Sequence, residues 1–510
     1  MEFVLNISSS LSSAAYCLAC ILVAAMWTLW RRSVRTPYPP GPPADPLIGH
    51  LRFITFTDVP ETFHRWAKTY GDLVYLHVLG RNILIIDSVE VAADLLDKRG
   101  SKYSDRPNAP IFQLQGWTPG LTLSRCPGKE FTIQRRMAQN YLGRREVTKF
   151  NSIQVREARR LVSELPVDAG KAYEQFRRFS ASLIVEITYG QRITSDDDVW
   201  MKITHEVNRV AESSGPGGNT PIDFFPFLRH FPSWFPGTFY ATKAREAYPI
   251  VRRFKDYPYE TLKTQMVEGT AEPCFVKHEL DAIDGDPDID QETIIKGVAG
   301  ALYGAGYDTT WATLGVFLYA MVLHPECQRT ARNEIDAYLE GKRLPEFRDR
   351  KDLPYVEAVL QETIRWFPIS PLGIPHRLSE DDHFNGFFIP KGTVVFANIR
   401  AMSLREEHYA NPRKFLPERF LPPNGEPHFT QAFGFGRRVC VGRHFASDSL
   451  WIAIATILAT LDLRKAVDSR GIEIIPEFKI HTGLAYHPHP FICDIQFRSR
   501  QLESLLYASL

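Results

Sequence analysis

The chain has 510 residues, of which 44% are hydrophobic and 23% are charged, and this composition excludes a disordered, collagen-like or low-complexity protein. Lys and Arg number 60 against 59 Asp and Glu, so the net charge of +1 provides no field that would attract DNA or RNA, and we expect no nucleic-acid partner. The seven cysteines are scattered, without the paired spacing of a zinc domain or a disulfide scaffold.

The first predicted element is an uncharged, apolar segment near the N-terminus. The range from Phe3 to Trp30 carries no charge, and a helix of that length exceeds the ~30 Å thickness of the bilayer hydrocarbon. Arg31, Arg32 and Arg35 follow directly, which places the rest of the chain in the cytosol by the positive-inside rule. The alternative is a cleaved signal peptide, but its basic residues would precede the apolar run. We therefore predict a membrane anchor over residues 1–35.

A proline-rich stretch comes next. The run Pro37-Tyr38-Pro39-Pro40-Gly41-Pro42-Pro43 cannot form a helix or a central strand, so residues 36–46 should form a stiff, extended hinge. No second linker and no internal repeat follows, which predicts that residues 47–510 form one large domain.

Residues 222–240 are rich in aromatic side chains and poor in charges. Such a stretch could form ordinary core. It could equally form an apolar surface that enters the bilayer beside the anchor.

A long helix is predicted from Asp290 to His324. Asp290 is a suitable N-cap, and Pro325 cannot continue the helix. Because the sequence is apolar around almost the whole circumference, the helix should be buried at the centre of the domain.

The segment Ala305-Gly306-Tyr307-Asp308-Thr309-Thr310 interrupts this apolar pattern. Gly306 weakens the helix by ~1 kcal/mol, and a buried carboxyl is costly unless it is hydrogen-bonded or neutral. A carboxyl beside a hydroxyl at a helix irregularity suits the delivery of protons to a bound group, which would be the role of Asp308 and Thr309. The residues alone equally allow a structural interpretation, in which the threonines bond to carbonyls one turn earlier and Asp308 has a core partner.

Two motifs follow in the C-terminal half. In Glu362-Thr363-Ile364-Arg365, the acid and the base share one face of a helix, so that the guanidinium of Arg365 can fork onto the carboxylate of Glu362. In the run Phe433 to Gly442, FGFGRRVCVG, the glycines allow a tight turn whose amides point at the sulfur of Cys440. The N-terminus of the next helix adds a positive dipole end, and both effects favour a thiolate. Such a sulfur is an axial ligand for haem iron.

This run fits the pattern FxxGxRxCxG, the haem-binding signature of cytochromes P450, and the chain resembles that family over essentially its whole length. The resemblance implies a mainly helical α+β fold, the cytochrome P450 fold, with a long central helix over haem b and small β-sheets. One N-terminal transmembrane helix would precede it, and residues 47–510 would be the catalytic domain. It implies that Cys440 is the axial ligand of the iron, held in a loop that includes Phe433 and Gly436. It also implies that Asp308 and Thr309 belong to the oxygen-activation motif and deliver protons.

Further site residues come from the same resemblance. Glu362 and Arg365 should form a buried structural network with Arg419, which lies in the motif Pro417-Glu418-Arg419-Phe420. Haem propionates need cationic or hydrogen-bonding donors, and the candidates are Arg438, His376 and Arg135.

One position departs from the family pattern. Phe131 stands where the family's WxxxR element has tryptophan, with Arg135 as its arginine. A phenyl ring cannot donate the indole N–H, which puts one propionate hydrogen bond in doubt.

The motifs are closest to microsomal enzymes of filamentous fungi, in a group resembling O-methylsterigmatocystin oxidoreductase. This implies a monooxygenase that uses O2 to hydroxylate a lipophilic small molecule, in terpenoid or polyketide secondary metabolism. By position, its substrate pocket should draw on residues 106–124, 302–309, 369–374 and 482–486.

The chain has no Gly-rich nucleotide-binding motif and no room for a flavin domain, so its electrons must come from a separate protein. The family implies a membrane-bound NADPH–cytochrome P450 reductase, docking on a face that could include Arg135, Arg136, Arg437, Arg438 and Arg443. The expected location is the endoplasmic reticulum membrane, with a single span and the catalytic domain facing the cytosol.

Other functions stay open. A thiolate-haem isomerase or dehydratase would need neither O2 nor a reductase, but such enzymes often lack the acid and alcohol that Asp308 and Thr309 provide. A non-catalytic haem-binding sensor or carrier and a sterol demethylase are further alternatives. The sequence does not name the substrate, the carbon attacked or the number of oxidations.

Overall fold

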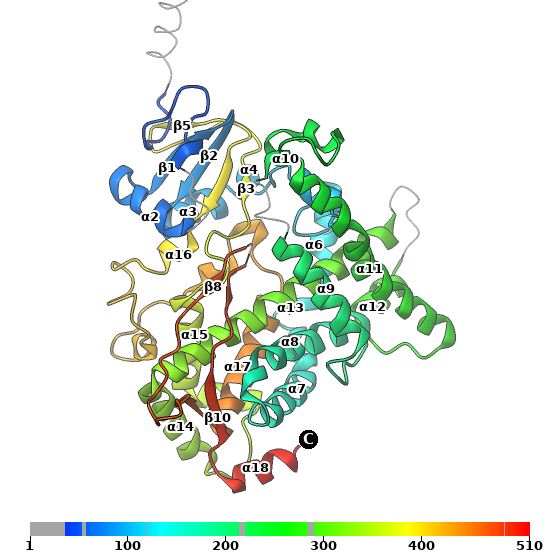
Figure 1. Cartoon of the computed structure of the whole chain (residues 1–510), viewed down its shortest axis with the longest axis vertical. Helices are drawn as coiled ribbons and strands as arrows, with labels where there is room; N and C mark the ends of the chain where they lie inside the picture. The colour runs from blue at the N-terminus through cyan, green and yellow to red at the C-terminus, as the bar shows by residue number, and fades with distance from the viewer. Residues whose placement is uncertain (1–35, 54–57, 119, 214–219, 284–289, 484) are drawn as a thin grey trace, which may run out of the picture.

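A computed structural model of the protein describes residues 36–53, 58–118, 120–213, 220–283, 290–483 and 485–510. Helices make up most of this part of the chain and the strands form small sheets (Figure 1), which confirms the predicted mainly helical α+β fold. The membrane anchor predicted over residues 1–35 lies outside the described residues. Within the ranges given above, no helix has both the length and the apolar character that a membrane crossing requires.

The helices surround one central helix, α13 (Gln291–Leu323). The others are, in chain order, α2 (Val59–Tyr70), α3 (Val89–Ala92), α4 (Gly100–Tyr103), α5 (Pro110–Leu114), α6 (Lys129–Leu142), α7 (Asn151–Glu164), α8 (Ala172–Tyr189), α9 (Val199–Ser213), α10 (Pro221–Phe224), α11 (Phe239–Glu268), α12 (Phe275–Asp281), α14 (Pro325–Leu339), α15 (Pro354–Trp366), α16 (Ile399–Met402), α17 (Arg443–Thr460) and α18 (Arg500–Tyr507). Short helical turns connect them: η1 (Leu51–Phe53), η2 (Ala93–Lys98), η3 (Val147–Phe150), η4 (Ala169–Lys171), η5 (Pro226–His230), η6 (Phe347–Asp352), η7 (Pro417–Phe420), η8 (Thr430–Phe433) and η9 (Gly436–Arg438).

A four-stranded sheet joins the N-terminal part of the chain to residues beyond position 370. Its strand order is β1-β2-β6-β3, for β1 (Leu73–Val78), β2 (Arg81–Ile86), β6 (Val394–Ala397) and β3 (His376–Arg377). Alternate side chains of β1 enter two different hydrophobic clusters, one on each face, as the period of two in a strand requires. The amide of Arg377 donates a 2.8 Å hydrogen bond to the carbonyl of Asp105. The sheet therefore brings β3 beside the segment that follows α4.

The central helix follows its predicted bounds closely. The carboxylate of Asp290 caps it by accepting a 3.0 Å hydrogen bond from the amide of Thr293, and Pro325 opens the next helix, α14. The helix is buried along most of its length, but the burial is interrupted near its middle, where Ala305 is exposed. One side of this otherwise buried helix is therefore accessible at the segment that the sequence singles out.

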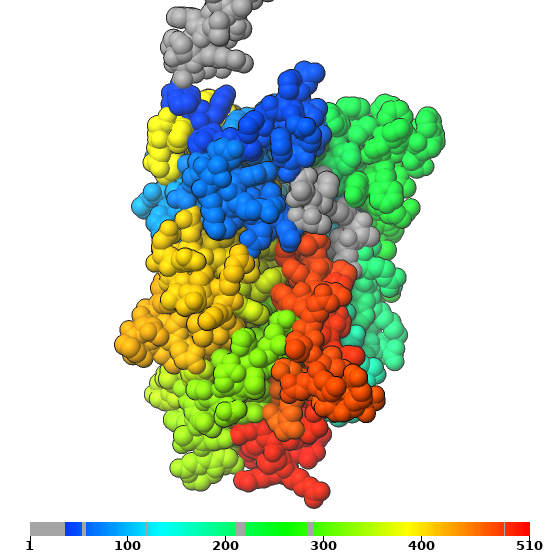
Figure 2. Space-filling view, turned by 60° about the vertical axis from the view of Figure 1, so that its left-hand side comes forward, coloured from blue at the N-terminus to red at the C-terminus, as the bar shows by residue number. Residues whose placement is uncertain are grey.

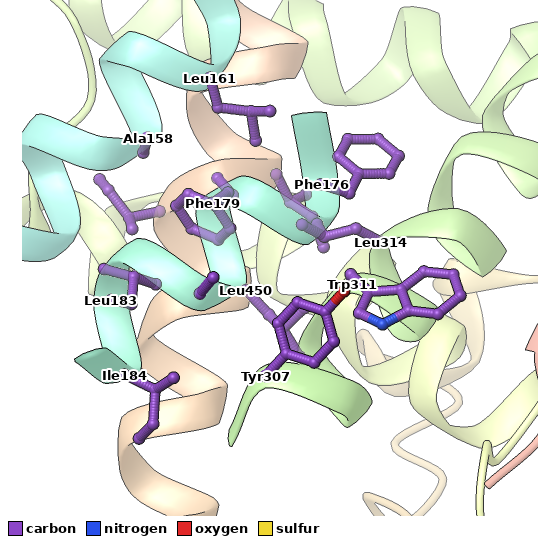
Figure 3. Close-up of a cluster of buried hydrophobic side chains, with 14 of the residues drawn as sticks. Ala158, Leu161, Phe176, Phe179, Leu183, Ile184, Tyr307, Trp311, Leu314 and Leu450 are labelled. Atoms are coloured by element: carbon purple, nitrogen blue, oxygen red, sulfur yellow. The ribbon is translucent and has the colours of Figure 1, made fainter. Parts of the chain in front are cut away.

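The largest hydrophobic core lies where α13, α8, α7 and α17 pack together (Figure 3). Phe176 and Phe179 of α8 and Leu450 of α17 are among its members. A Cβ atom on Gly306 of α13 would lie 2.7 Å from the side chain of Ile184 on α8. The glycine therefore permits the close approach of the two helices, which is a packing reason for its presence.

Three further pairs of antiparallel strands complete the fold. They are β7 (Leu461–Lys465) with β10 (Cys493–Phe497), β4 (Asp382–Phe384) with β5 (Phe387–Ile389), and β8 (Ile480–His481) with β9 (His487–Pro488). In the last pair His481 lies opposite His487, and β9 packs against α13. A segment close to the C-terminus therefore reaches the central helix.

The aromatic stretch over residues 222–240 forms a surface. Ile222 and Leu228 are buried, whereas other members are exposed, among them Phe225, Phe227 and Trp234, which is 79% exposed. In Figures 1 and 2 this green segment lies at the same end of the molecule as the blue residues that open the described chain. Of the two interpretations of this stretch, the structure supports the apolar surface.

Candidate functional site

Two glycines shape the loop that carries Cys440. The chain turns through η9, and the amide of Cys440 donates a 2.7 Å hydrogen bond back to the carbonyl of Phe433. Gly434 and Gly436 have φ angles of +79° and +52°, which glycine adopts without strain. A Cβ atom on Gly436 would also lie 2.1 Å from the carbonyl oxygen of Leu96. No other residue fits this position unless the backbone moves.

The pKa of the Cys440 thiol is set by opposing effects. Cys440 is exposed, yet desolvation by the surrounding protein raises the pKa of its thiol, opposed by the amide of Gly442 and the guanidinium groups of Arg135 and Arg443. The amide and the two guanidinium groups favour the thiolate, in the direction expected of the loop, but the lost hydration of the anion outweighs them. A coordinated metal ion would deprotonate the thiol.

Three basic side chains gather on backbone carbonyls beside this loop. Arg438 donates hydrogen bonds of 2.6 to 3.2 Å to the carbonyls of Ser104, Leu121 and Ser124. Arg106 donates hydrogen bonds of 2.6 to 3.0 Å to the carbonyls of Thr122, Ile374 and Pro375. Nδ1 of His376 lies 2.7 Å from the carbonyl oxygen of Tyr103, so this nitrogen carries the proton. We refer to Arg106, Arg438 and His376 as the cation cluster.

The positive charge of the cation cluster lies on Arg106 and Arg438, since His376 is neutral, and this charge is poorly balanced. Burial lowers the pKa of Arg438 to about 10 and that of His376 to about 3, and it holds the pKa of Arg106 well below its usual range. Arg106 and Arg438 also lower the pKa of His376 through their charges. The neighbouring carboxylate of Asp105 already forms a 2.9 Å ion pair with Arg125. A ligand with two negative charges would balance the cluster, so these residues fit the propionates of haem.

Phe131 contributes to this region through its ring. The guanidinium of Arg438 lies over the phenyl ring, 3.9 Å from its centroid. One turn further along α6, Nη1 of Arg135 donates a 2.7 Å hydrogen bond to the carbonyl of Val439. Phe131 thus supports Arg438 by a cation–π contact, and Arg135 braces the Cys440 loop.

The acid and two arginines expected to form a network lie in contact. The carboxylate of Glu362 accepts hydrogen bonds of 2.7 and 2.8 Å from Arg365 and one of 3.1 Å from Arg419. The side chains of Glu362 and Arg365 are fully buried and that of Arg419 is 2% exposed. Arg419 also forms a 2.6 Å ion pair with Glu426, so two carboxylates balance two guanidinium groups.

The middle of α13 shows features of both interpretations of its polar segment. The hydroxyl of Thr309 donates a 2.9 Å hydrogen bond to the carbonyl of Ala305, as the structural interpretation expects. Asp308 is paired with His487 of β9, with 2.8 Å between Oδ1 and Nε2. Asp308 and Thr309 are nevertheless both partly exposed, so neither is sealed in the core. Their side chains could therefore exchange protons with a bound group.

Two residues of this region were not singled out from the sequence, Arg106 and His487. Arg106 fell within a predicted pocket stretch, but no motif marked it as a member of a charged cluster. His487 lies one residue beyond another such stretch. The ring acquires its partner only when β9 packs on α13.

Comparison with known proteins gives a consistent result. The model of the cytochrome P450 family matches residues 39–492. Cytochrome P450 monooxygenase 136 of Postia placenta is 36% identical over 99% of this chain and 97% of its own length. A cytochrome P450 monooxygenase of Armillaria gallica is 36% identical over 96% of this chain and 98% of its own. Cytochrome P450 monooxygenase claT of Ampulloclitocybe clavipes is 36% identical over 90% of this chain and 91% of its own.

Proposed function

Because the chain belongs to the cytochrome P450 family, we propose that it is a haem-thiolate monooxygenase that hydroxylates a lipophilic small molecule with O2. We further propose that it acts in the secondary metabolism of a fungus, on a terpenoid or polyketide substrate; its similarity to cytochrome P450 monooxygenases of fungi supports the fungal setting. The observation that carries the proposal is the cation cluster of Arg106, Arg438 and His376 beside the Cys440 loop.

The residues that would hold haem b divide into two sets. Cys440 would ligate the iron, and Gly434 and Gly436 permit the turn that presents its sulfur. The cation cluster would bind the propionates, with Phe131 supporting Arg438. Haem, when bound, supplies the activation of O2.

The protein itself would supply proton transfer and a rigid frame for the haem. Asp308 and Thr309 stand at the accessible middle of α13, where a carboxyl and a hydroxyl can pass protons toward the reacting oxygen atoms. The buried network of Glu362, Arg365 and Arg419 would brace the haem-binding side of the fold, because it joins α15 to η7.

Electrons would come from a separate NADPH–cytochrome P450 reductase. Arg136 and Arg437 are exposed near the Cys440 loop and are available for a partner. Arg135 and Arg438 already donate to backbone carbonyls within the protein. Arg443 also donates a 3.0 Å hydrogen bond, to the carbonyl of Cys440, so we narrow the proposed docking face to Arg136 and Arg437.

Location and substrate access form the remaining part of the proposal. Residues 1–35 would anchor the protein in the endoplasmic reticulum membrane, residues 36–46 would act as the hinge, and residues 47–510 would be the catalytic domain in the cytosol. Residues 222–240 carry exposed aromatic side chains, and the ribbon of this segment lies at the end of the molecule where the described chain begins (Figure 1), which supports contact with the bilayer. A lipophilic substrate could enter from that side.

The direct test is the absorption spectrum of the reduced, CO-bound protein, compared for the wild type and Cys440→Ala. We expect a far red-shifted Soret band in the wild type and its loss in the variant. An unshifted band in the wild type would refute thiolate ligation. Consumption of NADPH and O2 with added reductase then separates a monooxygenase from an isomerase or a non-catalytic haem protein, because only the first requires both.

A further inference from the structure

Asp308 and His487 form a pair between the middle of α13 and the strand β9. Nε2 of His487 lies 2.8 Å from Oδ1 of Asp308. The His487 side chain is 12% exposed and that of Asp308 is 29% exposed, so water has limited access to the bond from the imidazole side. Among the described residues, His487 is the hydrogen-bond partner of the Asp308 carboxylate. The direction of this carboxyl group therefore depends on a residue 179 positions away in the sequence.

The imidazole of His487 is itself held in place. It stacks on the indole of Trp311, with 4.8 Å between ring centroids and 10° between ring planes. Trp311 lies three residues after Asp308 on α13, and positions i and i+3 share a helix face. The same face of the helix therefore provides both the stacking platform and the carboxyl group that the imidazole meets.

The platform is rigid because Trp311 is 2% exposed and packed in the core (Figure 3). The guanidinium of Arg177 on α8 lies over its ring, 4.5 Å from the centroid. The ring of Tyr173 contacts the indole edge-on, with 6.3 Å between the ring centroids. Because Trp311 cannot move without disturbing α8, the stacked imidazole has one favoured position.

Asp308, the other member of the pair, lies where proton delivery is proposed. Thr309 is the next residue, and its hydroxyl is turned to the carbonyl of Ala305. A carboxyl group on this helix has several staggered rotamers, and only some direct it toward the accessible side. A hydrogen bond from a ring with a fixed position selects among them.

We propose that His487 is a positioning residue that holds the Asp308 carboxyl group in the orientation required for proton delivery. The inference rests on the proposed monooxygenase function. In this proposal the imidazole of His487 is a hydrogen-bond partner of Asp308 and is not itself the proton donor. The strand β9 thereby contributes one residue, His487, that positions the proton-delivering carboxyl group.

The test compares two substitutions of His487 in the full-length protein, with reductase present. His487→Phe retains an aromatic ring for Trp311 but removes the hydrogen bond, whereas His487→Gln retains an N–H donor but cannot act as an acid or base. We expect His487→Phe to slow NADPH consumption roughly 10-fold and to enlarge its solvent deuterium isotope effect. We expect His487→Gln to remain within about twofold of the wild type. These two results together would attribute the slow turnover of His487→Phe to the loss of its hydrogen bond to Asp308.

A double-mutant cycle adds a measurement of thermal stability, which does not depend on turnover. Thermal unfolding midpoints of Asp308→Asn, His487→Phe and the double variant should be non-additive, because each single change already removes the same contact. The NADPH consumption of the double variant should be no slower than that of Asp308→Asn. The matched control is His481→Phe, which changes the histidine opposite His487 in the hairpin and should leave the rate unchanged.

The outcomes separate this inference from the proposed function. Wild-type NADPH consumption in His487→Phe, or equal slowing in His487→Gln and His487→Phe, would overturn the positioning role. A wild type that has the red-shifted Soret band but consumes no NADPH would refute the monooxygenase function, and the inference would fall with it. The Soret band of each variant verifies that it has folded and bound haem.

Discussion

The guanidinium of Arg438 lies 3.9 Å from the centre of the Phe131 ring. Arg438 belongs to η9 in the Cys440 loop, and Phe131 belongs to α6, about 300 residues earlier in the chain. The contact gives a role to a residue that departs from the family pattern, since the ring supports the cation by its negative face. A phenyl ring can make this contact although it has no N–H group to donate.

We expect Phe131→Leu to destabilise the protein by about 1 kcal/mol more than the change of side-chain size alone would. Leucine keeps an apolar group at this buried position but has no ring face for Arg438, and such contacts contribute roughly 0.5 to 2 kcal/mol. Chemical unfolding of the haem-bound protein measures the change. In an Arg438→Ala background the extra loss should disappear, and its persistence there would show that the ring acts by packing alone.

Arg106→Ala and Arg438→Ala should each lower the amount of haem bound per protein. Both substitutions remove a guanidinium of the cluster proposed to bind the propionates. Arg437→Ala is the matched control, because Arg437 is adjacent in the sequence but exposed. Haem content from the pyridine haemochromogen assay, relative to protein, should fall in the first two variants and stay unchanged in the control. Equal haem content in all three would contradict the assignment of the cluster.

Glu362→Gln should destabilise the protein by about 3 to 5 kcal/mol, because it leaves two buried guanidinium groups without their shared carboxylate. Glu357→Gln lies on the same helix and also removes a carboxylate paired with an arginine, but that side chain is 22% exposed. The control should cost at most about 1 kcal/mol. Unfolding free energies measure both changes, and similar values for the two variants would argue against the network as a structural brace.

Gly436→Ala should abolish the red-shifted Soret band, or reduce it strongly, because a Cβ atom would lie 2.1 Å from the carbonyl oxygen of Leu96. Gly386→Ala isolates the effect of the backbone angle. Gly386 also has a positive φ, +79°, but a Cβ atom there would extend into open space, with no contact within 4 Å beyond its chain neighbours. This control should cost only about 1 to 3 kcal/mol of stability. A normal band in Gly436→Ala would show that the Cys440 loop tolerates displacement.

Short-range features were predictable from the sequence because their causes lie within a few residues. Asp290 caps the central helix through the amide of Thr293, three residues away, and Arg365 reaches Glu362 across one helical turn. The motif around Cys440 was recognisable for the same reason, since its glycines and its cysteine are close together. The pKa of Cys440 was not predictable, because burial depends on the whole surrounding protein and outweighs the local amide.

The sequence by itself determined the central helix and the motif around Cys440, since periodicity, caps and motif spacing are properties of neighbouring residues, and the fold class followed from the resemblance that the motifs carry. Tertiary structure alone decided that Arg106 joins Arg438 and His376, that Phe131 supports Arg438, and that Asp308 meets His487. Each of these contacts joins residues far apart in the chain, so it depends on strand register and helix packing. Strand register and helix packing are set by the burial of the whole core, because no single segment specifies its own partner.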